Sequence, residues 1–248
     1  MADTPKYETV VVTIAEAVAT VTLNRPDKLN AYTVQLGDDL VDAFADLAVN
    51  DEVRVIVLTG AGKAFCAGVD LDVLKAQFAG ETPPGQKQLG EEHFVLGFCE
   101  DLLNYEKPVI VAFNGAAVGV GITMSLPCDI RIAARSAKLA LPFVKLGILP
   151  GLGSTYLLPR IVGLGKAKEL VMTGQKLTAD QALDIGLVNH VVDDEQLLDF
   201  TLDMAKSIAQ ANPKTITAAK QALDFAVQAD SFSEAVAFER NKALELRK

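Results

Sequence analysis

Two short segments constrain the fold of this chain most, because each leads from an apolar run through small residues into a helical pattern. They are residues 64–71 (AFCAGVDL) and residues 114–121 (NGAAVGVG). At such a junction the first N–H groups of the helix have no partner within the helix, and the helix dipole favours negative charge there. Two junctions that face each other can polarise one carbonyl oxygen. For either segment alone, glycines that simply permit a tight turn are the stronger explanation.

The patterns around these junctions predict a β/α first part and a helical last part. Residues 8–23 contain two β-rich runs, which predict an antiparallel hairpin. Apolar residues at intervals of four, four and three, from Leu36 to Leu47, predict one face of a helix. Strands are expected at residues 53–58, 109–113 and 129–133, and helices at residues 91–105 and over most of the chain after residue 154. Residues 80–85 are polar and rich in proline and glycine, which predicts a loop and a candidate mobile lid.

Charge and cysteine content exclude several classes of protein. The chain has 23 basic and 32 acidic residues, a formal charge of −9, and no cluster of cations, which argues against a nucleic-acid partner. No run approaches the ~18 apolar residues of a membrane helix, and the N-terminus lacks a signal-peptide pattern, so no membrane partner is expected. The spacing of Cys66, Cys99 and Cys128 fits neither a zinc motif nor a disulfide framework. We therefore expect a cytoplasmic protein without a metal site.

Further motifs carry a resemblance to a known family. They are residues 24–31 (NRPDKLNA), 107–108 (KP) before 114–115 (NG), 128–130 (CDI) and 146–154 (LGILPGLGS). On these residues and the two junctions, the chain resembles the enoyl-CoA hydratase/isomerase family, also called the crotonase family. The resemblance implies an α/β fold, with a crotonase-like superhelix of ββα turns and an acyl-CoA pocket over residues 1–190. It also implies a C-terminal helical assembly region over residues 191–248, used for trimer formation.

The resemblance further implies a substrate and a site. The substrate is an acyl-CoA thioester, so coenzyme A is part of the substrate and no separate cofactor is expected. The protein is expected to be a homotrimer or a dimer of trimers. In the family, the thioester oxygen lies between two backbone N–H groups, one from each junction. Two such preorganised amides stabilise an enolate-like oxyanion, and one donor is worth about 10²–10³ in rate.

By position, the resemblance assigns both donors and several binding residues. One donor is the N–H of Val69, which follows Ala67 and Gly68. The other is the N–H of Val120, which follows Gly119. Ala67, Gly68 and Gly119 are themselves substrate-binding candidates.

Three charged residues near the junctions are also binding candidates. Arg25 and Lys28 match positions beside the phosphates of coenzyme A, although two solvated turn charges explain either residue alone about as well. Asp70 follows the first junction, where it is a candidate for substrate binding. An acidic residue at that place also caps the first turn of a helix, and capping is the stronger explanation.

The resemblance breaks where relatives carry an acid–base carboxylate. The three positions hold Thr123, Phe143 and Gly151, which are retained only as substrate-binding candidates. General acid–base catalysis contributes about 10²–10⁴ in rate, so either another residue substitutes or the reaction differs. His93 is a candidate base because histidine titrates near neutral pH. The polar run around His93 favours the alternative, a partly exposed histidine on a helix surface.

Two functions remain open at this point. The first is an enzyme that acts on an acyl-CoA thioester through a stabilised enolate, as a hydratase, an isomerase or another lyase-type member. The second is an acyl-CoA-binding or assembly protein that has kept the fold and lost catalysis.

Overall fold

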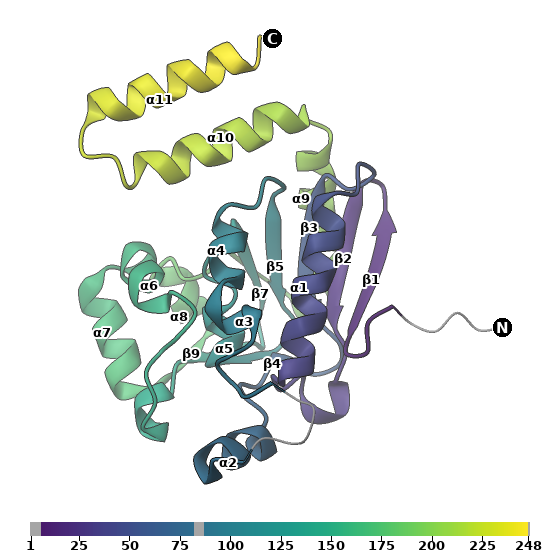
Figure 1. Ribbon diagram of the computed structural model, residues 1–248, viewed down its shortest axis with the longest axis vertical. Coiled ribbons are helices and arrows are strands. Elements are labelled where there is room, and N and C mark those ends of the chain that lie inside the picture. Colours follow the sequence, from purple (N-terminus) through teal and green to yellow (C-terminus); the bar gives the residue numbers. More distant parts are fainter. Residues whose placement is uncertain (1–5, 82–86, 248) are drawn as a thin grey trace, which may run out of the picture.

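The computed structural model, which describes residues 6–81 and 87–247, places an N-terminal hairpin at the edge of a six-stranded sheet (Figure 1). The predicted hairpin is formed by β1 (Val10–Ala15) and β2 (Val18–Leu23), which pair antiparallel. The sheet continues with four strands parallel to β2, and its order is β1-β2-β3-β5-β7-β10. These strands are β3 (Val55–Gly60), β5 (Val109–Phe113), β7 (Ile130–Ala134) and β10 (His190–Val192).

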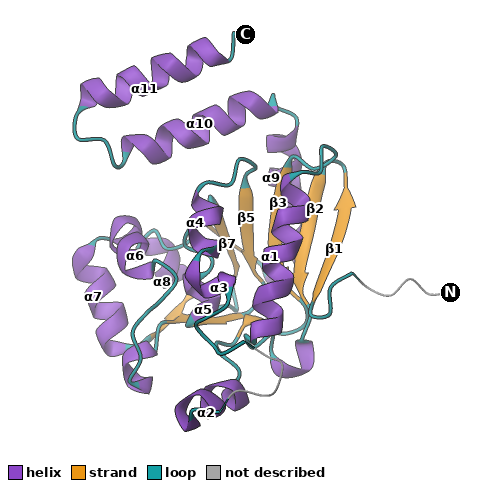
Figure 2. Cartoon of the chain, viewed as in Figure 1, coloured by secondary structure: helices purple, strands orange, loops and turns teal. Residues whose placement is uncertain are grey.

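A second sheet of four short strands carries both junctions (Figure 2). Its members are β4 (Ala64–Cys66), β6 (Ala116–Val118), β8 (Lys138–Ala140) and β9 (Lys176–Thr178), hydrogen-bonded in that order. β4, β6 and β8 are parallel, and β9 is antiparallel to β8. The prediction of a largely helical chain after residue 154 omitted β9 and β10. Each has three residues, too few to show a strand period.

The first helices follow the predicted pattern with one interruption. α1 (Val34–Ala48) begins where the Thr33 side chain accepts a hydrogen bond from the N–H of Leu36. α2 (Leu71–Ala79) follows the first junction. The single helix predicted over residues 91–105 is instead α3 (His93–Leu96) and α4 (Phe98–Leu103), separated at Gly97. Most of the predicted lid at residues 80–85 lies in the segment 82–86, outside the described residues.

The later helices complete the fold. They are α5 (Val120–Thr123), α6 (Ser154–Val162), α7 (Leu164–Thr173), α8 (Ala179–Asp184), α9 (Leu197–Ala209), α10 (Pro213–Ala226) and α11 (Phe232–Glu245). Short 3-10 turns lie at Pro26–Lys28, Phe143–Leu146 and Asp194–Gln196. Within the described ranges, no helix combines the length and apolar character needed to cross a bilayer.

The large sheet separates two apolar clusters because successive side chains of a strand point to opposite faces. Ile56 and Leu58 of β3 pack with the apolar face of α1. Val55 and Val57 pack on the other face with residues of α9. The boundary predicted between residues 190 and 191 falls inside β10. α9 lies within the predicted assembly region, but its apolar residues belong to the core of the large sheet. α10 and α11 lie together beyond one end of the large sheet (Figure 1).

α10 contacts the loops beside the sheet through Thr217, whose hydroxyl donates to the carbonyl oxygen of Glu106 at 3.0 Å, and through Lys220. Its Lys220 Nζ lies 3.0 Å from Asp129 Oδ2, which also accepts a hydrogen bond from the N–H of Val109. α11 packs on α10, with the rings of Phe225 and Phe238 stacked at 4.2 Å between centroids. No residue of α11 is buried in the single chain.

The contact between the two junctions leads to the first prediction. A Cβ atom at Gly115, just before β6, would lie 2.1 Å from the carbonyl oxygen of Lys63, just before β4. Gly115→Ala should therefore lower the free energy of unfolding by about 2–3 kcal/mol, because backbone would have to move. Gly165→Ala in α7, where nothing lies within 4 Å, should instead raise it by about 0.5–1 kcal/mol. Urea unfolding measures both, and equal effects of the two variants would contradict the close approach.

Candidate active site

The second sheet brings the two junctions together. β4 and β6 are parallel neighbours, with Ala64 opposite Ala116, so the loops that follow them leave the same edge of the sheet. A Cβ atom at Gly68 would lie 3.5 Å from the carbonyl oxygen of Val118. A Cβ atom at Gly121 would lie 2.7 Å from the carbonyl oxygen of Cys66. The segments 64–71 and 114–121 are therefore in direct contact.

Each predicted donor follows a glycine in a conformation that other residues rarely adopt. Gly68 has φ of 106°, and Gly119 has φ of 54° with ψ of −112°. Because the backbone turns at these glycines, Val69 and Val120 leave the strand direction.

The two donor N–H groups are also without partners. Asp70 N–H and Gly68 C=O both bond to the backbone of Tyr32, at 2.9 and 2.8 Å, while the N–H of Val69 lies between them. Val120 is the first residue of α5, so its N–H has no acceptor within the helix. In residues 6–81 and 87–247, neither N–H makes a hydrogen bond. The geometry leaves two amides of adjoining loops available to an external acceptor.

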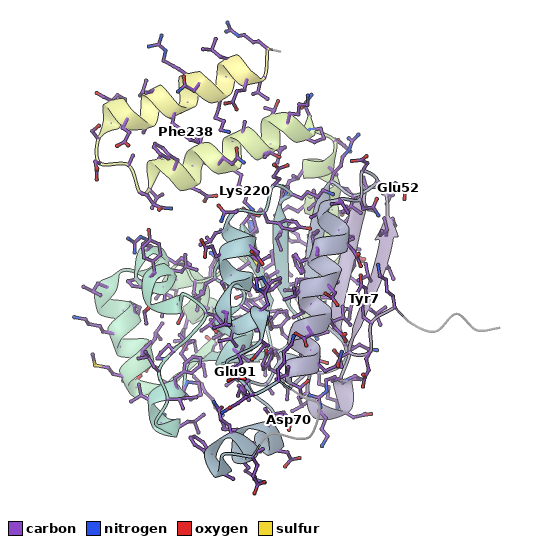
Figure 3. The ribbon with its side chains drawn as sticks, viewed as in Figure 1. Tyr7, Glu52, Asp70, Glu91, Lys220 and Phe238 are labelled. Atoms are coloured by element: carbon purple, nitrogen blue, oxygen red, sulfur yellow. The ribbon has the colours of Figure 1, made fainter. Side chains whose placement is uncertain are left out.

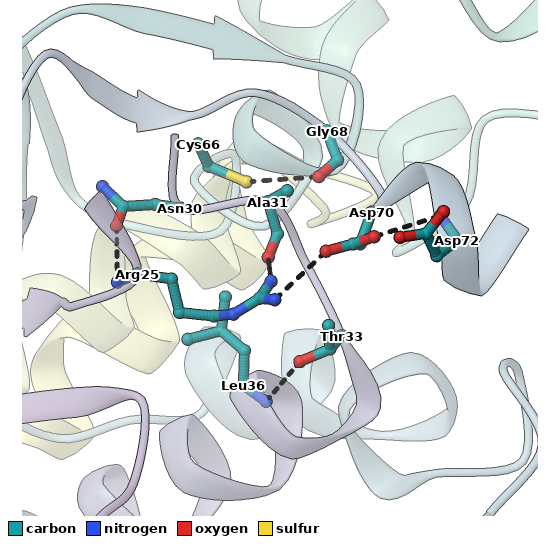
Figure 4. A network of polar contacts seen from close by, with 9 residues as sticks. All are labelled: Arg25, Asn30, Ala31, Thr33, Leu36, Cys66, Gly68, Asp70 and Asp72. Atoms are coloured by element: carbon teal, nitrogen blue, oxygen red, sulfur yellow. Dashed lines mark hydrogen bonds and ion pairs between the residues drawn. The ribbon is translucent and has the colours of Figure 1, made fainter. Parts of the chain in front are cut away.

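The turn at residues 24–31 is locked to the first junction (Figure 4). The buried Asn30 accepts a hydrogen bond from the N–H of Arg25 at 2.8 Å and donates to the carbonyl oxygen of Ala64 at 2.8 Å. It also donates to the carbonyl oxygen of Ala61 at 2.9 Å. The Arg25 guanidinium reaches the carbonyl oxygen of Ala31 and lies 3.1 Å from Asp70.

Asp70 has the capping role that the sequence favoured. Its carboxylate accepts a hydrogen bond from the N–H of Asp72 at 3.1 Å, at the start of α2. Burial by itself raises the pKa of Asp70, but the Asp72 N–H and the Arg25 guanidinium outweigh it and lower that pKa below its usual value. Asp70 is thus an ionised structural group at the edge of the junction. Figure 3 shows it beside α2.

A cavity of about 580 Å³ lies beside this network. Its walls come from the 24–31 turn, the start of α1, one face of α2 and residues 87–89. Three cations and five carboxylates line it, and two of the cations are paired, Arg25 with Asp70 and Lys87 with Asp38. Among the described lining residues, Lys28 is the cation without an ion pair. The negative charge of the chain thus extends into the cavity and leaves one cation for an anionic group.

The three positions that lack a carboxylate have different surroundings. Thr123 is buried in α5, and its hydroxyl lies 3.5 Å from the carbonyl oxygen of Val120. The ring of Phe143 lies 3.6 Å from the place of a Cβ at Gly119, so it covers the second junction. Gly151 is exposed, with nothing within 4 Å of a Cβ. Phe143 and Thr123 thus lie at the second junction, and neither supplies a carboxylate for proton transfer.

His93 lies on the surface instead of at the junctions. Its side chain is 53% exposed, and its Nε2 lies 2.6 Å from the equally exposed carboxylate of Asp101. It does not line the cavity. His93 is therefore a partly exposed histidine on a helix surface, as the alternative to a catalytic base predicted. In the described part of the chain, no group of three or more histidine, cysteine or acidic side chains is placed to hold a metal ion.

The residue that sequence reasoning missed is the neighbour of His93. Glu92 is completely buried, and its Oε1 accepts a hydrogen bond from the Tyr32 hydroxyl at 2.6 Å. Its Oε2 accepts from the N–H of Gly90 at 2.6 Å. No local signal distinguishes Glu92, because Glu91 and His93 on either side of it are exposed.

The sequence and fold of the chain are similar to those of known proteins. Residues 13–246 match the family described as enoyl-CoA hydratase/isomerase. A 1,2-epoxyphenylacetyl-CoA isomerase of Escherichia coli is 38% identical over 213 residues, which are 86% of this chain and 80% of the relative. A short-chain-enoyl-CoA hydratase of Clostridium acetobutylicum is 40% identical over 225 residues, with 90% and 83% covered. The crystal structure of an enoyl-CoA hydratase from Bacillus anthracis has a TM-score of 0.85 at 35% identity, covering 95% of this chain and 90% of that one.

The second prediction concerns Asn30. Asn30→Ala should lower the free energy of unfolding by about 3 kcal/mol, because it removes three hydrogen bonds to backbone. The Arg25 N–H and the Ala61 carbonyl oxygen lose their side-chain partner, and the Ala64 carbonyl oxygen keeps only the Asn114 amide, at 3.3 Å.

The matched control is Asn50→Ala, where a half-buried side chain accepts one surface hydrogen bond from Glu52 N–H. This variant should change stability by less than about 0.5 kcal/mol. Similar losses in chemical denaturation would show that the Asn30 contacts contribute little.

Proposed function

Because the chain belongs to the enoyl-CoA hydratase/isomerase family, we propose that it holds an acyl-CoA thioester oxygen between the N–H groups of Val69 and Val120. The relatives are named hydratases and isomerases, so the chain is an enzyme of hydratase/isomerase type. One observation carries the proposal: two N–H groups without partners, each after a glycine of positive φ, on loops in contact.

The two N–H groups would act on the negative charge that develops on the thioester oxygen during the reaction. Removing a proton from the carbon next to a thioester, or adding a nucleophile across a conjugated double bond, moves negative charge onto the thioester oxygen. Two fixed amides stabilise that charge without reorganising during the reaction, and the effect grows where water is excluded. Val120 is buried and Phe143 lies over Gly119, which keeps this side of the junction apolar.

Arg25 and Lys28 have different parts in this proposal. Arg25 is held by Asp70 and Ala31, so it fixes the first junction against the 24–31 turn. Lys28 lines the cavity and is exposed, so its ammonium is the group offered to the phosphates of coenzyme A. The coenzyme arrives as part of the substrate, and no separate cofactor enters the proposal.

The alternative of a binding or assembly protein without catalysis is not favoured, because the relatives carry the names of enzymes. The positions of Thr123, Phe143 and Gly151 mean that the proton transfers do not use the customary carboxylates. The proposal therefore specifies how an enolate is stabilised and assigns no acid–base pair.

The third prediction tests the second donor. Val120→Pro removes its N–H at the first position of a helix, where proline is well tolerated. Turnover of short and medium 2-enoyl-CoA and 3-enoyl-CoA should fall about 10²–10³-fold.

Val120→Ala, which keeps the N–H, is the matched control and should retain most of the activity. His93→Ala should behave like the wild type, because its imidazole lies on the surface. Circular dichroism establishes that each variant is folded. If folded Val120→Pro turns over as fast as Val120→Ala, the second donor plays no part; if the wild type turns over none of these thioesters, the proposed reaction fails for them.

The fourth prediction concerns assembly, which we propose to be a homotrimer or a dimer of trimers. Large apolar side chains are exposed on and beside α10 and α11, namely Leu223, Val227, Phe232, Leu244 and Leu246. Burial of such a surface against other copies is the expected driving force. Sedimentation should show a trimer or hexamer for the wild type and smaller species for Leu223→Ser/Phe232→Ser. Val49→Ser, an equally exposed site beyond the end of α1, should leave the assembly unchanged, and a monomeric wild type would refute the proposal.

A further inference from the structure

A fully buried carboxylate in this chain has no role in the chemistry described so far. Glu92 lies directly before α3 and has no exposed surface. Burying a carboxylate costs several kcal/mol unless its oxygens are well hydrogen-bonded. Both oxygens of Glu92 are bonded, one to Tyr32 and one to Gly90, each at 2.6 Å.

The Tyr32 side chain packs closely between Phe94 and Gly37. Its ring stacks on Phe94, with centroids 4.7 Å apart. Its hydroxyl lies over Gly37 of α1, where a Cβ would come within 2.5 Å of the oxygen. Burial, together with the Glu92 carboxylate, raises the pKa of Tyr32 far above its usual value. The phenol therefore remains protonated and donates to Glu92.

The backbone of Tyr32 holds the first junction. Its N–H donates to the carbonyl oxygen of Gly68 at 2.8 Å, and its carbonyl oxygen accepts from the N–H of Asp70 at 2.9 Å. These two hydrogen bonds are on either side of Val69, so they set the direction of the N–H that would meet the thioester oxygen. A rotation of Tyr32 would move that donor.

Glu92 also reaches the wall of the cavity. Gly90, which donates to its Oε2, follows Leu89, and Leu89 lines the cavity together with Gln88 and Lys87. One carboxylate thus joins the cavity wall to the residue that carries Val69. Apolar side chains of equal volume would fill the space, but they would not fix direction as hydrogen bonds do.

We propose that Glu92 and Tyr32 are positioning residues, which hold the Val69 N–H in the direction needed to polarise the thioester oxygen. The inference rests on the proposed function, since it assigns the pair to the same oxyanion site. Neither residue touches the reacting atoms in this proposal. Displacement of a catalytic donor by about 1 Å costs up to about 10²-fold in rate.

The test uses the spectrum of a bound thioester as well as turnover. The probe is 4-(dimethylamino)cinnamoyl-CoA, whose absorption moves to longer wavelength when hydrogen bonds polarise its carbonyl group. The variants are Tyr32→Phe, Glu92→Leu and Glu92→Gln. An amide at position 92 can accept from Gly90 N–H and donate to the Tyr32 oxygen, so it preserves both contacts. The control is Tyr105→Phe, which removes a hydroxyl that bonds to Phe44 C=O at 2.7 Å, elsewhere on α1.

The wild type should shift the absorption of the probe. Tyr32→Phe and Glu92→Leu should lose most of that shift and about 10-fold or more in kcat, with a smaller change in KM. Glu92→Gln should retain both the shift and kcat. Tyr105→Phe should lose comparable thermal stability and retain the full shift, so stability loss alone does not imitate the result.

Three outcomes would overturn the proposal in different ways. If Tyr32→Phe, folded, shifts the probe as the wild type does, the pair does not position the donor. If Glu92→Gln keeps the shift but loses kcat about 10²-fold, Glu92 transfers a proton and is a catalytic residue. If the bound probe shows no shift in the wild type, the oxyanion site itself is refuted, and the inference falls with it.

Discussion

The parallel pairing of β4 with β6 is the interaction on which the candidate site depends. Neither strand has more than three residues. Their pairing nevertheless places two glycine-containing loops at one sheet edge, in contact at Gly68 with Val118 and at Gly121 with Cys66. The absence of a side chain at Gly115 and Gly121 permits this approach, because a Cβ at either would collide with backbone of the other loop. The loops that carry the two N–H groups are neighbours through that contact.

Hydrogen-bonded polar groups hold the first loop from outside the sheet. Asn30 ties the 24–31 turn to the backbone before β4, and Arg25 ties it to Asp70. Tyr32 pairs with the loop through its backbone and with Glu92 through its hydroxyl. Directional contacts of this kind suit a site in which an amide must point at a developing charge, since apolar packing alone fixes volume more than direction.

The charge of the chain is distributed unevenly with respect to the anionic substrate that we propose. The chain has a formal charge of −9, and carboxylates outnumber cations even in the cavity. Two of the three lining cations are neutralised by ion pairs. Lys28 differs from Arg25 because it has no ion pair among the described residues, although the sequence offers the same reason to propose both as cations for coenzyme A. At the second junction, Thr123 is buried and the Phe143 ring lies beside Gly119.

The sequence by itself determined the local elements and the chemistry that the backbone offers. The hairpin of β1 and β2, helix α1, strands β3, β5 and β7, and the cap at Asp70 all follow from periodicity and from residues close together in the chain. The glycines of the two junctions were visible for the same reason, whereas the missing carboxylates were recognised only through the family that the chain resembles.

Only the tertiary structure decided the rest. β9 and β10 become strands through pairing with distant partners, and the helix predicted over residues 91–105 breaks at Gly97. Arg25 is bound to a residue 45 positions away, and Glu92 to one 60 positions away. Glu92 and His93 are adjacent and polar, yet one is buried and the other exposed, because burial depends on what the fold packs against each side chain and not on the neighbouring residues.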